Sequence, residues 1–160
     1  MMGVGKSTLG KNVAKRQNLT FIDTDLNIEK KFSMKITEIF KKKGEIFFRI
    51  QEEKEVLESL KKNKTVIALG GGAFLKKSVR EKILKNSLSI WLDINLKTLN
   101  KRLKWNKKRP LLSGENTQII IKKLFAQRKS IYKLANHKIN CNNLSKEDII
   151  KKIIDLYEKQ

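Results

Sequence analysis

The sequence contains few residues of several types, and each shortage excludes a class of protein. A single cysteine, Cys141, excludes an internal disulfide and favours a reducing compartment. A single histidine, His137, leaves no histidine-based metal cluster. No apolar run is long enough to span a membrane, and the first residues do not have the pattern of a signal peptide. We therefore expect a cytoplasmic protein without a membrane partner, in which Cys141 and His137 are structural.

Aromatic residues are also sparse, at 7%, whereas positive charge is abundant. A formal net charge of +21 is typical of nucleic-acid-binding proteins. The lysines are spread along the whole chain, however, and aromatic residues are not interleaved with the basic runs, so no base-stacking platform is predicted. We interpret the charge as solvated helix faces in a lysine-rich composition and expect no nucleic-acid partner. A basic nucleic-acid-binding protein is the alternative.

Arginine is scarce as well, since only six of the 37 basic residues are arginine. Where lysine is the default cation, an arginine suggests a position that needs a planar fork able to form two parallel hydrogen bonds. The six are Arg16, Arg49, Arg80, Arg102, Arg109 and Arg128.

A glycine-rich turn at the start of the sequence runs directly into a helical pattern. It reads Gly3-Val4-Gly5-Lys6-Ser7-Thr8. Such glycines let backbone N–H groups converge on an anion, the helix directs its positive end the same way, and the lysine reaches the outer phosphates. The serine hydroxyl suits Mg²⁺. The first glycine of the full phosphate-binding motif and the strand before it are missing, so a flexible glycine-rich segment is the alternative.

Apolar runs of strand type alternate with amphipathic helical patterns along the remaining chain. This alternation predicts one α/β domain with a parallel sheet covered by helices on both faces. Strands are expected at 19–22, 65–69, 88–92 and 138–141, and the run at 65–69 has the composition of a strand buried on both faces. Helices are expected at 8–17, 26–32, 36–43, 45–61, 75–85, 96–103, 119–134 and 145–158, the last with a capping signature at Ser145 and Asp148.

Two of the predicted strands end in residues suited to chemistry. Asp23 and Asp25 follow the first strand, where α/β folds place their active sites, and they share one face of an extended chain. Alternatively, Asp25 simply caps the helix that begins near residue 26. The strand at 65–69 ends in Gly70-Gly71-Gly72, which permits close approach of the backbone to a ligand.

Two further segments carry charge that suits a ligand. Arg49 lies early on the helix predicted at 45–61, and Glu52 and Glu53 follow one turn later, so a surface ion pair is the alternative to ligand binding. Residues 104–115 are rich in basic residues and include Arg109. They predict an exposed loop that closes over a charged substrate.

Taken in order, these motifs resemble the shikimate kinase family over essentially the whole chain. The resemblance implies a P-loop three-layer sandwich similar to nucleoside monophosphate kinases, with a parallel sheet of order 2-3-1-4-5 whose first strand is missing here. It implies one kinase domain over 1–160, with a substrate-binding insert at about 25–62 and a lid loop at about 104–116. The motifs are Gly5-Lys6-Ser7-Thr8, Asp23-Thr24-Asp25, Gly44-Glu45 with Phe48-Arg49, Gly70-Gly71-Gly72, Arg109-Pro110-Leu111-Leu112 and Gln127-Arg128 with Tyr132.

The activity that the resemblance implies is transfer of the γ-phosphoryl group of ATP to the 3-hydroxyl of shikimate, a step toward chorismate and the aromatic amino acids. Mg²⁺ would be required, the small molecule shikimate would be the partner, and we expect a monomer. Lys6 would stabilise the transferred charge, while Ser7 and, through water, Asp23 would hold the metal. The residues that would cradle the phosphates are Gly3, Val4, Gly5, Lys6, Ser7 and Thr8.

The resemblance also implies how the acceptor is held. Asp25 would accept the proton of the attacking hydroxyl, and Arg49 and Arg128 would grip the shikimate carboxylate. Gly71 and Gly72 would present backbone N–H groups to the ring. Arg109 would meet the phosphates and Arg102 would pack against adenine, whereas residues 142–144 offer no arginine or proline for adenine.

Two further expectations concern the identity of the acceptor and the start of the chain. A related kinase for gluconate or a nucleotide would share the ATP half of the site, but Asp25, Arg49, Gly71 and Arg128 argue against it. A missing central strand would leave several buried backbone groups unpaired, at about 1–3 kcal/mol each, so we expect the functional chain to begin about ten residues upstream of Met1.

Overall fold

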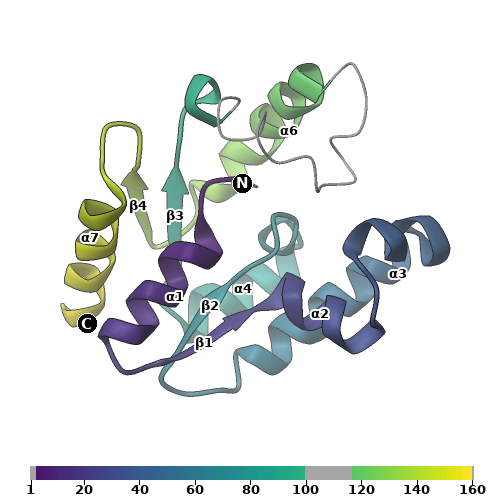
Figure 1. Cartoon of the computed structure of the whole chain (residues 1–160), viewed down its shortest axis with the longest axis horizontal. Helices are drawn as coiled ribbons and strands as arrows, with labels where there is room; N and C mark the ends of the chain where they lie inside the picture. Colours follow the sequence, from purple (N-terminus) through teal and green to yellow (C-terminus); the bar gives the residue numbers. More distant parts are fainter. Residues whose placement is uncertain (1–2, 100–116, 160) are drawn as a thin grey trace.

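The computed structural model describes residues 3–99 and 117–159, which form an α/β fold (Figure 1). Its strands are β1 (Thr20–Asp23), β2 (Thr65–Ala68), β3 (Ile90–Asp93) and β4 (His137–Asn140). β1 pairs with β2 in parallel, and β3 pairs with β4 in parallel. All four predicted strands are therefore confirmed, each shifted by at most two residues.

The two strand pairs are not joined to each other by a ladder in the part of the chain that the structure describes. In the expected order 2-3-1-4-5 they correspond to strands 2-3 and 4-5, on either side of the central position. β2 is less enclosed than predicted, because only Ala68 of its four residues is buried. The expectation of burial on both faces is thus wrong for this strand, which has β1 as a partner on one edge only among the described residues.

The helices lie on both sides of these strands (Figure 1). The near side carries α1 and α7, and α1 packs against β1, β2 and α7, while α4 lies on the far side. The apolar positions at Leu9, Val13 and Ala14 form the buried face of α1, as their helical spacing predicts. The helical elements are α1 (Lys6–Arg16), α2 (Thr24–Phe32), α3 (Ile36–Ser59), the short 3₁₀ helix η1 (Ala73–Leu75), α4 (Lys77–Asn86), α6 (Thr117–Tyr132) and α7 (Lys146–Glu158), and residues 96–99 are also helical.

Gly44 bends α3 into two segments, which confirms the break expected between 43 and 45. Its backbone has φ 82° and ψ 166°, a conformation that is open to glycine and strained for other residues. The bend lets the first segment of α3 fold back beside α2. Consequently Ile28 of α2 shares one hydrophobic cluster with Ile39 and Phe48, which come from the two parts of α3.

Two hydrophobic cores hold the described residues together. The larger one joins α1, α4, α6 and α7 with residues of β2, β3 and β4, and it contains the buried Cys141. The smaller one lies between α2 and α3 around Ile28, Ile39 and Phe48, with Phe32 and Phe47 among the side chains that flank it. α3, the helix that carries Arg49, is therefore held against α2 by a hydrophobic core of its own.

The last helix, α7, begins with the cap that the sequence predicts. Ser145 and Asp148 form the predicted capping box: the Ser145 hydroxyl accepts from the Asp148 N–H at 3.1 Å, and Asp148 accepts from the Ser145 N–H at 3.0 Å.

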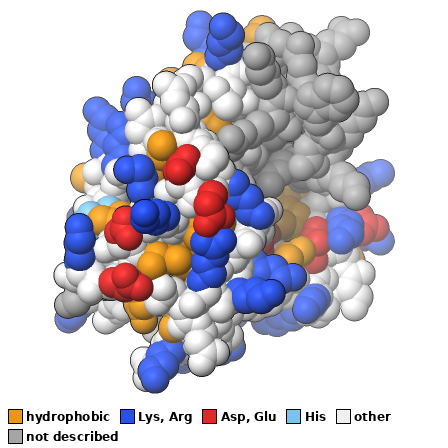
Figure 2. Space-filling model, turned by 60° about the vertical axis from the view of Figure 1, so that its left-hand side comes forward, with side chains coloured by type: hydrophobic (Ala, Val, Ile, Leu, Met, Phe, Trp, Pro, Cys, Tyr) orange, Lys and Arg blue, Asp and Glu red, His pale blue; other side chains and the backbone are white. Residues whose placement is uncertain are grey.

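On the face shown in Figure 2, lysine and arginine side chains are scattered and alternate with carboxylates. None of the helices in the described ranges is long and apolar enough to cross a membrane.

Candidate functional site

The glycine-rich turn leads into α1 in the geometry that an anion site requires. Gly3 and Gly5 have φ values of 75° and 93°, in the left-handed region that glycine tolerates. Val4 is buried and anchors the turn to the core, whereas Gly5, Ser7 and Thr8 are exposed. Among the described residues, no side chain caps the start of α1 and no acidic residue lies in its first turn. The positive end of this helix is thus presented to an anion.

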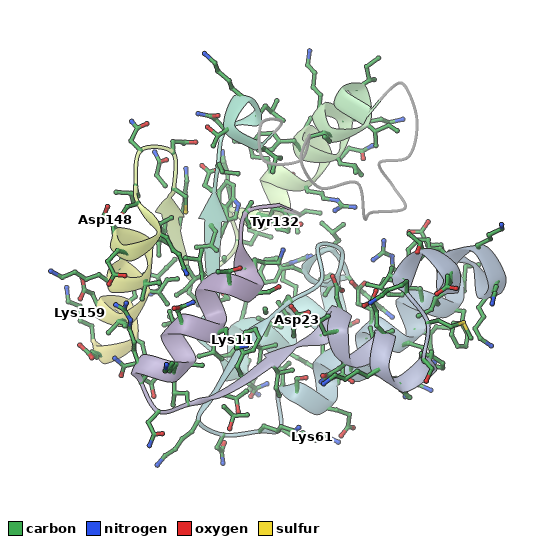
Figure 3. The ribbon with its side chains drawn as sticks, viewed as in Figure 1. Lys11, Asp23, Lys61, Tyr132, Asp148 and Lys159 are labelled. Carbon is green, nitrogen blue, oxygen red and sulfur yellow. The ribbon has the colours of Figure 1, made fainter. Side chains whose placement is uncertain are left out.

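Asp23 connects the first turn of α1 with the end of β1. Its Oδ2 accepts a hydrogen bond of 2.5 Å from the Ser7 hydroxyl. Its Oδ1 accepts from the N–H groups of Asp25 and Leu26, at 3.1 Å and 3.2 Å. Asp23, labelled in Figure 3, is therefore the N-cap of α2. The alternative in which Asp25 caps this helix is wrong, because the helix starts two residues earlier than predicted.

The Ser7–Asp23 pair fits a magnesium ion by the chemistry of its donors. A hydroxyl and a carboxylate oxygen already lie side by side, and Mg²⁺ is commonly bound by one or two carboxylates together with substrate phosphates. Within residues 3–99 and 117–159 there is no group of three or more His, Cys, Asp or Glu side chains that would hold a metal alone. Phosphate oxygens and water would have to supply the remaining ligands of such a site.

Thr24 ties the β1–α2 junction to the end of β2. Its side chain is fully buried, and its hydroxyl donates to the Ala68 carbonyl at 3.3 Å and accepts from the Gly70 N–H at 3.0 Å. This bridge fixes the glycine run beside the two aspartates. Sequence reasoning assigned no role to Thr24, and its position between Asp23 and Asp25 was the only available signal.

Gly70 lies against two carboxylates from different helices. A methyl group on Gly70 would come within 2.5 Å of both Asp25 Oδ1 and Glu52 Oε1, so only a hydrogen atom fits there. Asp25 is half-buried, whereas Glu52 is 2% exposed. Because Gly70 has no side chain, the carboxylate of Asp25, which is the predicted base, can lie directly against the backbone at the end of β2.

Arg49 is held in one orientation by several neighbours. Its Nη1 donates to Glu52 at 2.7 Å and its Nη2 to Glu45 at 2.9 Å, while its guanidinium carbon lies 5.4 Å from the centre of the Phe48 ring. A methyl group on Gly72 would lie 2.1 Å from Arg49 Nη1. Burial opposes the charge of this side chain, but the carboxylates of Glu52 and Glu45 outweigh it and raise the pKa of Arg49.

This arrangement corrects the expected ion pair of Arg49. Glu52 is its partner, as predicted, but the buried position of Glu52 makes the pair something other than an exposed surface contact. Glu53 pairs with Lys76 instead. A charge as buried as that of Glu52 is costly unless it is paired, so Arg49 and Glu52 hold each other in place. The sequence placed Glu52 near Arg49 but gave no sign of its burial.

Gly71 receives two hydrogen bonds from α6. Arg128 Nη1 donates to the Gly71 carbonyl at 3.1 Å, and the Tyr132 hydroxyl donates to the same oxygen at 2.6 Å. Both side chains are buried, with 6% and 7% of their surface exposed. Burial raises the pKa of Tyr132, although the nearby charge of Arg128 opposes this effect. Tyr132 was part of the recognised motif, but sequence reasoning assigned it no role.

The remaining arginines divide into two kinds. Arg16 forms an exposed pair with Glu147 that joins α1 to α7, and Arg80 donates to the carbonyl groups of Phe74 and Leu75. Both are accounted for by contacts within the fold. Arg102 and Arg109, together with the lid loop expected at 104–116, lie outside the described residues.

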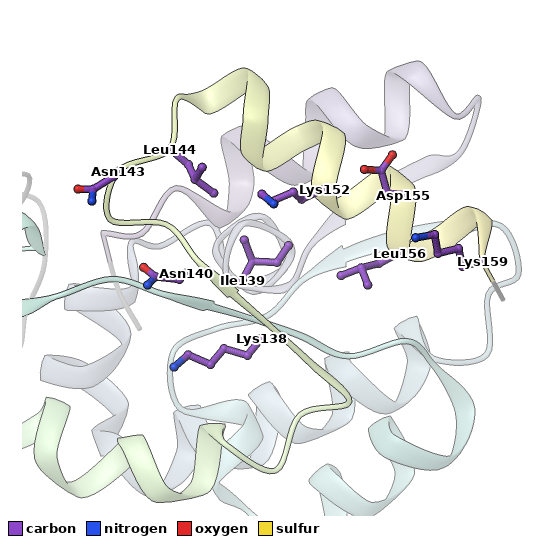
Figure 4. A pocket seen from close by; sticks show the side chains of 9 residues that line it. All are labelled: Lys138, Ile139, Asn140, Asn143, Leu144, Lys152, Asp155, Leu156 and Lys159. Carbon is purple, nitrogen blue, oxygen red and sulfur yellow. The ribbon is translucent and has the colours of Figure 1, made fainter.

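A separate pocket of about 510 Å³ lies between β4 and α7 (Figure 4). Lys138, Lys152 and Lys159 surround it, and Ile139 and Leu156 provide apolar surface. None of the residues predicted for catalysis or binding lines this pocket. The candidate site is instead the junction of the glycine-rich turn, the β1–α2 corner and Gly70-Gly71-Gly72.

Comparison with known proteins points to one family. The sequence model described as shikimate kinase matches residues 2–158. A shikimate kinase of Bartonella henselae is 41% identical over 154 residues, which cover 96% of this chain and 73% of the relative. The structure of a shikimate kinase from Acinetobacter baumannii in complex with shikimate has a TM-score of 0.93 and 31% identity, and the match covers 99% of this chain and 89% of that one. For a shikimate kinase from Bacteroides thetaiotaomicron the TM-score is 0.89, with 30% identity and coverages of 98% and 94%.

Proposed function

Because the chain belongs to the shikimate kinase family, we propose that its glycine run, its β1–α2 corner and the two arginines that contact the run, Arg49 and Arg128, form the acceptor site of a kinase. The protein is an enzyme that phosphorylates shikimate with ATP. We propose the 3-hydroxyl as the acceptor atom, Mg²⁺ as the metal, and a cytoplasmic monomer that binds no nucleic acid as its working form.

The observation that carries the acceptor site is the set of contacts around the three consecutive glycines. Asp25 and Glu52 lie against Gly70, the Gly71 carbonyl is bound by Arg128 and Tyr132, and Arg49 lies against Gly72. Carboxylate and guanidinium groups thus converge on a stretch of backbone that carries no side chains of its own. This arrangement suits a small polyhydroxylated acid, because a carboxylate needs cations and a reacting hydroxyl needs a base.

Asp25 is the base in this proposal. It would accept the proton of the attacking hydroxyl, and the hydrogen bonds of the two preceding residues, Asp23 and Thr24, fix the backbone that carries it. Arg49 and Arg128 would pair with the substrate carboxylate and so orient the ring, and the N–H groups of Gly71 and Gly72 would complete the contacts. Phosphoryl transfer depends mainly on positioning and on stabilising charge, so these groups are chemically sufficient for the acceptor half.

The turn from Gly3 to Thr8 would hold the phosphates of ATP. The backbone N–H groups at the start of α1 have no side-chain cap and would bind the phosphate oxygens, and Lys6 would neutralise charge that develops on the transferred group. Ser7 and Asp23 would hold Mg²⁺, which supplies charge neutralisation between phosphate oxygens when bound. Arg109 meeting the phosphates and Arg102 packing on adenine remain proposals from the family resemblance.

A substrate panel tests this function. ADP release from ATP is measured with shikimate, with gluconate and with a nucleoside monophosphate as the acceptor, each at several Mg²⁺ concentrations. Shikimate alone is expected to accelerate ADP release, and only with Mg²⁺ present. Acceleration by gluconate or the nucleotide instead would reassign the acceptor. Tight RNA binding with a steep salt dependence and no ATP turnover would favour the nucleic-acid alternative.

A further inference from the structure

The Gly71 carbonyl is the point at which α6 holds the glycine run. Its oxygen accepts the shorter of two hydrogen bonds, 2.6 Å, from the Tyr132 hydroxyl and the longer, 3.1 Å, from Arg128 Nη1. Tyr132 and Arg128 are four residues apart on α6, so both reach the same target from one face of the helix.

The Gly71 carbonyl and the Gly72 N–H belong to the same peptide unit. That unit is rigid and planar, and its C=O and N–H point in opposite directions. Fixing the carbonyl toward α6 therefore turns the Gly72 N–H away from α6. Glycine has the widest backbone freedom of any residue, so a run of three needs an outside anchor to keep one peptide orientation.

Tyr132 is built to be that anchor. Its ring packs against Phe74 and Trp91, with ring centres 6.4 Å and 6.3 Å away, and the residue is 7% exposed. Its hydroxyl therefore has little freedom to leave Gly71. Arg128, in contrast, has several donors and is the proposed partner of the substrate carboxylate, so its hold on Gly71 competes with its role toward the ligand.

We propose that Tyr132 is a positioning residue for shikimate: its hydroxyl fixes the Gly71–Gly72 peptide so that the Gly72 N–H is presented to the substrate and Arg128 can turn to the carboxylate. This inference rests on the proposed function of the site. Tyr132 itself acts through the backbone and through Arg128, so its effect falls on the acceptor and leaves ATP binding alone.

Tyr132→Phe isolates the hydroxyl, because the ring and its packing remain and Arg128 still bonds the Gly71 oxygen. The matched control is Tyr157→Phe, at a half-exposed position on α7. We expect Tyr132→Phe to raise KM and Kd for shikimate by about threefold to tenfold, the usual worth of one neutral hydrogen bond. KM for ATP and kcat should stay close to the parent, because ground state and transition state lose the same contact. The thermal midpoint should fall by only about 2–4 °C, the usual effect of one lost hydrogen bond in a domain of this size. Every parameter of Tyr157→Phe should stay close to the parent.

The Arg49→Lys variant, measured beside these two, separates the possible failures. If Arg49→Lys raises KM for shikimate and Tyr132→Phe does not, the positioning role is wrong and the proposed function stands. If neither variant changes KM for shikimate, the proposed acceptor site is wrong and the role of Tyr132 falls with it. A Tyr132→Phe variant that loses thermal stability and affinity for both substrates alike would show a merely structural hydroxyl, which also overturns the proposal.

Discussion

Ser7 and Asp23 are joined by a hydrogen bond of 2.5 Å between the first turn of α1 and the end of β1. The other oxygen of the same carboxylate caps α2. One oxygen of Asp23 therefore serves the cap of α2, and the other lies on the side of the proposed metal. The two roles can be separated, because asparagine caps helices about as well as aspartate but carries no charge.

Replacement of Asp23 by two different residues tests this division. Asp23→Asn is expected to keep the stability of the parent and to raise the Mg²⁺ concentration for half-maximal rate by roughly tenfold, the usual effect of losing a group that orients a metal through water. Asp23→Ala should show the same shift and, in addition, lose about 1 kcal/mol of unfolding free energy with the cap. Magnesium titrations and urea unfolding give both values. An unchanged magnesium dependence in Asp23→Asn would remove Asp23 from the metal site.

Gly72→Ala is expected to weaken shikimate binding. The new methyl group would meet Arg49 Nη1 at 2.1 Å, and the end of that flexible side chain must move aside. Loss of one charge-assisted hydrogen bond costs about 1.5 kcal/mol or more, so Kd for shikimate should rise roughly tenfold or more. Calorimetric titration of the variant with shikimate measures this change.

Gly44→Ala is the matched control for that substitution. Nothing lies within 4 Å of the new methyl group, but the φ of 82° is strained for alanine. We expect a loss of about 1–3 kcal/mol of unfolding free energy without a change in shikimate affinity. The interpretation of Gly72 fails if Gly72→Ala binds shikimate as tightly as the parent does.

Arg49→Lys and Arg128→Lys keep the charge but lose the planar fork. Each should weaken shikimate binding by about 1.5–3 kcal/mol, roughly ten- to hundredfold, and leave ATP affinity nearly unchanged. Kd values for the two ligands, measured separately, decide the matter. Weakened ATP binding with normal shikimate binding would mean that these arginines serve the other ligand.

Tyr132 is expected to make the fold sensitive to alkali. Burial raises its pKa, so the folded state binds the phenol proton more tightly than the unfolded chain does. Its contribution is fully present below the ordinary tyrosine pKa near 10 and is lost as the pH rises through the higher pKa of the folded state. The stability of Tyr132→Phe should therefore fall less between about pH 9 and 11 than that of the parent. Equal losses in both proteins would contradict a buried, protonated Tyr132.

Local patterns in the sequence were sufficient for most of the fold. Hydrophobic periodicity gave the strands and helices, and turn chemistry gave the break at Gly44 and the cap at Ser145. These features depend on neighbours in the chain, which a sequence displays directly. The start of α2 was misplaced by two residues because Asp23 and Asp25 are both good capping residues, and only the structure shows which one caps.

Burial and contacts between distant segments could not be predicted in the same way. Glu52 is a charged residue next to a predicted partner, and nothing in its neighbourhood indicates that it is buried. The hydrogen bond that the Gly70 N–H donates to Thr24 and the one that Tyr132 donates to Gly71 join residues 46 and 61 positions apart. Family motifs placed these residues close to the site, but their contacts follow from the packing of α2 and α6 on the end of β2.

The most direct test of the account is ADP release by the parent and by Asp25→Asn, each with and without shikimate. The parent should release ADP quickly only when shikimate is present. Asp25→Asn should keep its fold, because Asp23 caps α2, and should bind ATP normally, but its shikimate-dependent rate should fall by about 10²–10⁴-fold as expected for loss of a general base. A parent whose ADP release does not respond to shikimate, or an Asp25→Asn variant with near-normal turnover, would contradict the proposed site.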